Sequence, residues 1–79
     1  MELWIRSQDK TVLMNISNLI IKQANGYYYI GTKTGKNIFE LGQYNSKWRA
    51  LEILEEIQDL YQNAYIGNGN RIVCQMPEK

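Results

Sequence analysis

The chain contains no histidine, one cysteine and one proline, and these shortages exclude whole classes of protein. A structural zinc site needs several Cys and His ligands, and a disulfide within the chain needs a second partner for Cys74, so both are excluded. A chain of 79 residues forms one domain, and a core of that size supplies only roughly 3–5 kcal/mol of stability. We therefore expect the chain to gain stability as a homo-oligomer, a dimer or larger.

Long apolar runs and an excess of one charge are also missing. Apolar runs are only three or four residues long, as in Leu19–Ile21, so we find neither a membrane span nor the apolar core of a secretory leader. We expect a cytoplasmic protein with no membrane partner. Nine Lys and Arg residues against eight Asp and Glu residues give a net charge of +1. A nucleic acid partner is not expected, because such domains are usually strongly basic.

The segment 46–65 has the clearest periodicity in the chain. At about 100° per residue, apolar side chains fall on one half of a helix and polar side chains on the other. The apolar half carries Ala50, Leu51, Ile53, Leu54, Ile57, Leu60, Tyr61 and Ala64. We predict one amphipathic helix over 46–65 with Ser46 as its N-cap. The apolar half is wider than one small sheet needs, so either part of it faces a second subunit or Leu51 and Tyr61 flank an ordinary core.

Before this helix the apolar residues alternate in steps of two, which is typical of strands. The expected strands are 2–7, 11–14, 18–24, 27–33 and 37–41, with a last strand at 71–75 after the helix. Asn25-Gly26 predicts a type I′ hairpin, and Thr34-Gly35-Lys36 predicts the next reversal. The sequence thus predicts a single α+β domain over 1–79, an antiparallel sheet of five or six strands packed against one long helix.

No catalytic constellation is present in the sequence. Cys74 has no histidine to act as its base, and its apolar neighbours are typical of a small buried thiol. The carboxylates of the helix lie on a convex, solvated face, where nothing would raise a pKa for acid–base chemistry. We therefore expect no enzyme, no metal and no cofactor.

Ligand binding without catalysis is a candidate at the end of the predicted helix. Asn68, Gly69, Asn70 and Arg71 put backbone N–H groups, two carboxamides and a guanidinium side by side. Such groups suit a small anionic ligand, because backbone donors and the arginine fork both match phosphate oxygens. The simpler interpretation is an ordinary helix C-cap followed by a surface arginine, and both stay open.

Trp48 is the apolar residue that does not fit the helix pattern. It projects about 160° from Ala50, inside the polar half of the helix. We favour local packing of its ring on Tyr44 or on another sheet residue near the helix start. The alternative is an exposed anchor for a protein partner, with Glu52, Glu55 and Asp59 beside it.

Three blocks of the sequence together resemble a family of small proteins from phages and mobile elements of Firmicutes. The blocks are Trp4-Ile5-Arg6-Ser7-Gln8-Asp9-Lys10, the segment from Leu41-Gly42-Gln43-Tyr44 through Ser46-Lys47 to Glu55-Glu56-Ile57, and Met76-Pro77-Glu78. Members of this family often carry a polar residue where this chain has Trp48. The resemblance implies a phage-related origin rather than a particular activity.

The chain is also loosely similar to the phage anti-Thoeris sponge proteins, which are oligomers that sequester cyclic nucleotide signals without cleaving them. In those proteins an arginine near the last strand holds the ligand, and Asn68-Gly69-Asn70-Arg71 matches that pattern. This resemblance implies a non-enzymatic anti-defence protein in which Arg71 pairs with phosphate, the two asparagines bind base or ribose, and Tyr44 stacks on a base. The alternative is an inhibitor or adaptor of a host protein that docks through Trp48.

Overall fold

The structure is a computed structural model that describes residues 2–66 and 71–79. Its elements are β1 (Glu2–Arg6), β2 (Leu13–Asn15), β3 (Ile20–Ala24), β4 (Tyr27–Thr34), β5 (Asn37–Tyr44), α1 (Lys47–Ile66) and β6 (Arg71–Gln75). The α+β class is confirmed, and α1 agrees with the predicted helix to within one residue at each end. Ser46 is the N-cap, because its Oγ accepts a hydrogen bond of 3.1 Å from the backbone N–H of Arg49.

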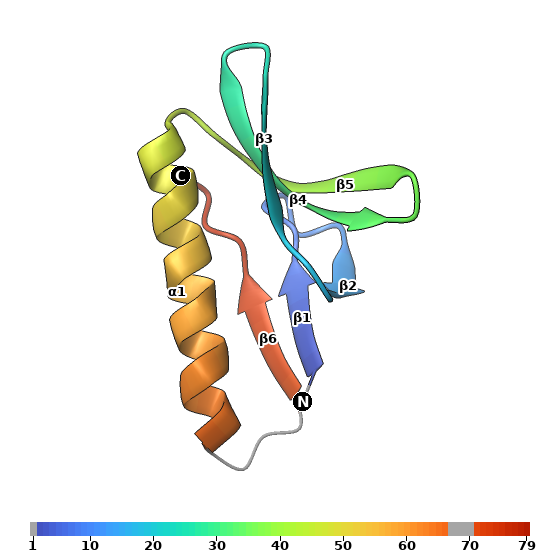
Figure 1. Ribbon diagram of the computed structural model, residues 1–79, viewed down its shortest axis with the longest axis vertical. Helices are drawn as coiled ribbons and strands as arrows, with labels where there is room; N and C mark the ends of the chain where they lie inside the picture. Colours follow the sequence, from blue (N-terminus) through green and yellow to red (C-terminus); the bar gives the residue numbers. More distant parts are fainter. Residues whose placement is uncertain (1, 67–70) are drawn as a thin grey trace.

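The strands form two three-stranded sheets, ordered β2-β1-β6 and β3-β4-β5, so the prediction of one antiparallel sheet is wrong. Strand β6 also pairs with β1 in parallel. This direction follows from the path of α1, which carries the chain back to the level where β1 starts before β6 begins (Figure 1). One helix covers only one face of a broad sheet, whereas two small sheets and a helix can enclose a common core.

The predicted hairpins are confirmed. Asn25 and Gly26 have φ of 53° and 80°, as a type I′ turn requires, and Ala24 pairs with Tyr27 across it. Strand β5 continues to Tyr44 instead of ending at 41. Leu41 is an extra residue of β5 opposite the step from Ile30 to Gly31, and beyond this bulge β5 stays paired with β4 as far as Tyr44.

The core lies between α1 and the facing sides of the two sheets. Its buried residues are Ile5, Ile16, Ile30, Leu41, Tyr44, Ala50, Ile53, Ile57 and Met76. Leu51 and Leu60, at the two margins of the apolar half of α1, are exposed. The apolar half is therefore only partly covered within the single chain.

The side-chain amides of Gln8 and Asn18 bond to the backbone of β5 and β4 as a neighbouring strand would. The Gln8 side chain accepts from the backbone N–H of Gln43 at 2.9 Å and donates to the Gln43 carbonyl at 3.1 Å. The Asn18 side chain accepts from the N–H of Lys33 at 2.8 Å and donates to its carbonyl at 3.0 Å. The Gln8 amide therefore links the segment after β1 to β5 of the other sheet, whereas Asn18, two residues before β3, continues the β3–β4 ladder within one sheet.

In the part of the chain that the structure describes, no helix has both the length and the apolar character needed to cross a lipid bilayer.

Candidate functional site

Tyr44, the expected base-stacking residue, lies in the core. It is 2% exposed, and its hydroxyl donates a hydrogen bond of 2.8 Å to the carbonyl of Pro77. Burial raises its pKa to about 12, because the phenolate would lose its hydration there. A ring packed in this way has no free face for a base.

Arg71, the expected phosphate partner, is exposed at the first position of β6. Its Nε lies 3.7 Å from a carboxylate oxygen of Glu2, and its guanidinium lies over the Trp4 ring, 5.3 Å from the centroid. Asn68, Gly69 and Asn70 lie outside the described residues. The 20-residue helix α1 separates Arg71 in sequence from Tyr44, and a helix of that length spans about 30 Å. The structure therefore does not bring Arg71 and Tyr44 into one site.

Trp4 is the aromatic residue that does lie beside Arg71, and the sequence analysis did not single it out. Its position on β1 pairs with Asn15 of β2 and with Val73 of β6, so it occupies the centre of the β2-β1-β6 sheet. The indole N–H is buried and has no hydrogen-bond partner. The signal in the sequence was the alternation that put Glu2, Trp4 and Arg6 on the side opposite Leu3 and Ile5.

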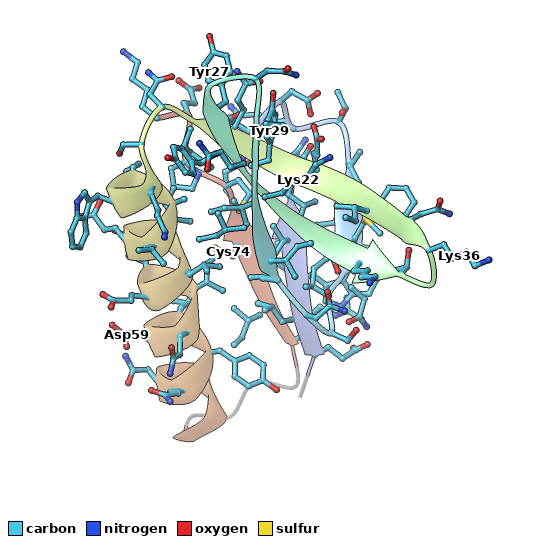
Figure 2. The ribbon with its side chains drawn as sticks, turned by 45° about the horizontal axis from the view of Figure 1, so that its top comes forward. Lys22, Tyr27, Tyr29, Lys36, Asp59 and Cys74 are labelled. Atoms are coloured by element: carbon cyan, nitrogen blue, oxygen red, sulfur yellow. The ribbon has the colours of Figure 1, made fainter. Side chains whose placement is uncertain are left out.

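Trp48 is 82% exposed, so the expected packing of its ring on Tyr44 is wrong. Residues Trp48, Leu51 and Glu55 follow one another at spacings of three and four, which puts them on one face of α1. They line a shallow hollow on the helix surface together with Arg49 and Glu52. We call Trp48, Leu51, Glu55 and Asp59 the helix patch, and Figure 2 shows Asp59 projecting away from the sheets.

The carboxylates near Trp48 fall into two groups. Glu52 and Glu56 are both paired with Arg49. Glu55 and Asp59 have no ion-pair partner among the residues that the structure describes. The helix patch is therefore an exposed indole next to uncompensated negative charge.

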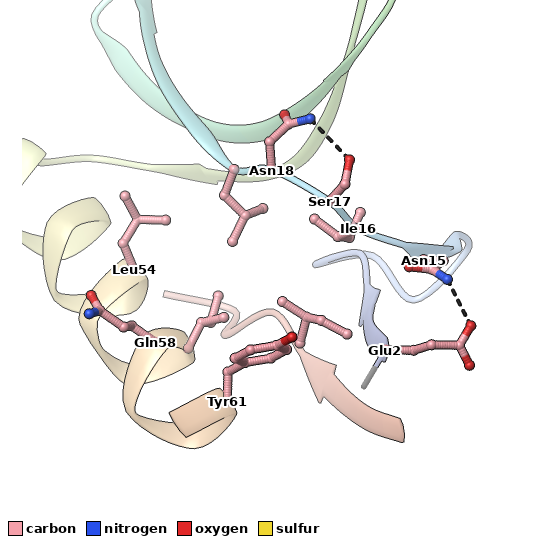
Figure 3. A pocket seen from close by; sticks show the side chains of 11 residues that line it. Glu2, Asn15, Ile16, Ser17, Asn18, Leu54, Gln58 and Tyr61 are labelled. Atoms are coloured by element: carbon pink, nitrogen blue, oxygen red, sulfur yellow. Dashed lines mark hydrogen bonds between the residues drawn. The ribbon is translucent and has the colours of Figure 1, made fainter. Parts of the chain in front are cut away.

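A cavity of about 710 Å³ opens between α1, the start of β1 and the segment that joins β2 to β3 (Figure 3). Its inner wall is apolar, with Leu3, Ile16, Leu19, Leu54 and Ile57. Its rim is polar, with Glu2, Asn15, Ser17, Asn18, Gln58 and Tyr61. A cavity of this volume is within the usual range for small-molecule sites.

Among the residues that the structure describes, the one charged side chain at this rim is Glu2, which lies 3.7 Å from the Nε of Arg71. Glu2 carries the carboxylate, and the Asn15 side chain donates a hydrogen bond of 3.0 Å to it. None of the described residues lining the cavity is a lysine or arginine. Because Arg71 compensates Glu2 and no described residue adds a cation to the lining, the cavity suits a neutral ligand better than a phosphate.

Cys74 is a half-buried thiol on the inner side of β6. Burial raises its pKa, and the nearby carboxylate of Glu56 adds to this effect. A thiol with a raised pKa is a poor nucleophile at neutral pH. Within residues 2–66 and 71–79, no group of three His, Cys, Asp or Glu side chains is arranged to hold a metal ion.

No family model matches the chain, and no match was found among curated proteins or solved structures. The candidate sites therefore depend on the geometry of this chain.

Proposed function

We propose that the protein is a non-enzymatic accessory protein that docks, through the helix patch, on a host protein with a basic surface around an apolar pocket. The observation that carries this proposal is the 82% exposure of Trp48 on the side of α1 opposite the core. A large aromatic ring in water gains free energy when a partner buries it, and tryptophan is the residue most enriched among binding hot spots.

The charge around the indole supports the choice of partner. Glu55 and Asp59 lie along the same side of α1 as Trp48 and have no ion-pair partner in the described part of the chain. Lysine or arginine side chains of a partner would complement them and speed association, whereas an acidic surface would be repelled. Docking should therefore weaken as salt is raised.

The test is affinity capture followed by reconstitution. The immobilised protein is exposed to a Firmicutes lysate, the retained protein is identified by mass spectrometry, and that protein is then purified for calorimetry. Trp48→Ala should raise the Kd for the captured partner by about thirtyfold or more, which is the loss of binding free energy of about 2 kcal/mol expected for a hot spot. The double variant Glu55→Lys, Asp59→Lys should reduce the salt dependence as well as the affinity.

Tyr27→Ala is the matched control, because Tyr27 is another exposed aromatic residue but lies on β4, away from the helix patch. It should leave the Kd unchanged. An equal Kd for the wild type and Trp48→Ala, or equal losses with Trp48→Ala and Tyr27→Ala, would contradict docking through this patch.

Sequestration of a cyclic nucleotide is a second candidate, supported by the exposed guanidinium of Arg71 beside an aromatic ring. Trp4 takes the stacking role in this version, because Tyr44 is buried. Glu2 disfavours an anion, since its carboxylate lies 3.7 Å from Arg71 and already compensates that charge.

Calorimetry with cyclic ADP-ribose isomers and cyclic dinucleotides tests this candidate. If the protein sequesters a cyclic nucleotide, at least one of these nucleotides binds, and Arg71→Ala removes the heat of binding. Lys36→Ala is the control: it removes a cation from the β4–β5 turn and should leave the heat of binding unchanged. Absence of heat with every nucleotide, or binding that survives Arg71→Ala, would rule it out.

A further inference from the structure

The β2-β1-β6 sheet has an outer face that points away from the core. Alternation along each strand and the register between strands place every second residue on this face. The outer face consists of Glu2, Trp4 and Arg6 of β1, Leu13 and Asn15 of β2, and Arg71, Val73 and Gln75 of β6. The opposite side of the same sheet carries Ile5 and Ile72, which are buried in the core.

The outer face carries exposed apolar side chains around the half-buried Trp4. Val73 lies directly beside Trp4 and is 59% exposed, and Leu13 is 51% exposed on the other flank. Antiparallel sheets can leave one face in water, but that face is then normally polar. Trp4 has Val73 on one side and Asn15 on the other, and Leu13 lies beside Arg6. A tryptophan and two aliphatic side chains among arginines have the composition of an interface rather than of a solvated face.

The charges on the outer face are complementary to those on the outer face of a second copy whose strands run in the opposite direction. Glu2 lies at one end of β1 and Arg6 at the other, two residues either side of Trp4. Arg6 has no carboxylate partner among the described residues. If the outer face of a second copy packs on this one with the two β1 strands antiparallel, each Glu2 faces Arg6 of the other copy. If the two β1 strands are parallel, Glu2 faces Glu2 and Arg6 faces Arg6. In the antiparallel arrangement each Glu2 would lie between Arg71 of its own chain and Arg6 of the second copy, so this arrangement is the electrostatically favoured one.

We infer that the outer face binds a second copy of the chain. The two copies are related by a two-fold axis that crosses the strands, with Trp4 and Val73 in the centre and Glu2 of each subunit opposite Arg6 of the partner subunit. Two-fold pairing of one patch with itself is the commonest closed assembly. Two strands of five residues and one of three cover at most about 16 Å by 14 Å. This is small beside the roughly 800 Å² that each partner buries in a standard stable interface, so the dimer is weak.

Sedimentation equilibrium over about 10 µM to 1 mM protein tests this inference, since a small interface is expected to have a Kd in or near that range. Each single reversal, Glu2→Arg or Arg6→Glu, should weaken dimerisation about tenfold or more, because two ion pairs become two repulsions. The double variant Glu2→Arg, Arg6→Glu should restore most of the affinity. Thermal unfolding of each variant checks that the subunit itself stays folded.

Val73→Asp gives a second readout that does not depend on the ion pairs. It puts a charge in the middle of the apolar centre and should abolish the dimer, whereas Ile38→Asp, at an exposed position on β5, should not change it. A protein that stays monomeric at 1 mM, single reversals without effect, or a double variant no better than either single would each overturn the inference.

Discussion

Replacement of Gln8 by alanine is expected to lower the free energy of unfolding by about 2–3 kcal/mol, or roughly 10–20 °C in melting temperature. The Gln8 amide joins the two sheets and the C-terminal segment. Besides its pair of hydrogen bonds with Gln43, its Nε2 donates to the carbonyls of Pro77 at 3.2 Å and Glu78 at 2.7 Å. Alanine would leave the N–H and carbonyl of Gln43 and the carbonyl of Glu78 without the Gln8 amide, whereas the Pro77 carbonyl would keep its hydrogen bond from the Tyr44 hydroxyl. Chemical denaturation measures the effect.

Two companion variants show whether the hydrogen bonds are the cause. Gln62→Ala removes the same side chain from the exposed side of α1 and should change stability by less than about 0.5 kcal/mol. Gln8→Glu keeps the acceptor for Gln43 but turns a carboxylate toward several carbonyls, which raises the pKa of that carboxyl in the folded state. Its stability should therefore recover as the pH falls and the carboxyl regains an O–H donor. Wild-type stability in Gln8→Ala would contradict the role of this residue.

Gly31→Ala is expected to destabilise the protein by about 2–4 kcal/mol, most of what a domain of this size has. Gly31 of β4 lies opposite the bulge in β5, where the backbone of β5 comes close. A Cβ at this position would overlap the carbonyl oxygen of Phe39 and lie 3.2 Å from its carbonyl carbon. Both atoms belong to the backbone, so β5 itself would have to move.

Gly26→Ala is the control for this substitution. A Cβ there meets nothing within 4 Å, although φ of 80° adds a cost, expected to be about 1–2 kcal/mol. Urea unfolding should rank the wild type as most stable, then Gly26→Ala, then Gly31→Ala. Equal stability of Gly31→Ala and the wild type would show that the two strands are not packed as closely as described.

Features set by local sequence were predictable. The helix over 46–65 and the Asn25-Gly26 hairpin depend on periodicity and on backbone preference within a few residues, and the structure has both. The division into two sheets was not predictable from local patterns, and neither were the hydrogen bonds of Gln8 and Asn18. Their side-chain amides bond to strands distant in sequence, and no local pattern distinguishes such an amide from a solvated one.

The candidate sites show the same limit. The period of α1 placed Trp48 among polar residues, but whether a neighbour covers its ring depends on tertiary packing, and the neighbours leave it exposed. Tyr44 shows the opposite case. It follows a predicted strand and precedes the helix, where an aromatic residue can face either side, and the hydrogen bond to Pro77 near the far end of the chain fixes it inside.

We propose that Trp48, with its exposed indole on α1, is the docking residue. The most direct test is a calorimetric titration of the captured and purified partner into wild-type protein and into Trp48→Ala at matched ionic strength. Docking through Trp48 predicts a measurable Kd for the wild type and a Kd about thirtyfold higher or more for the variant. The same Kd for both proteins would contradict it.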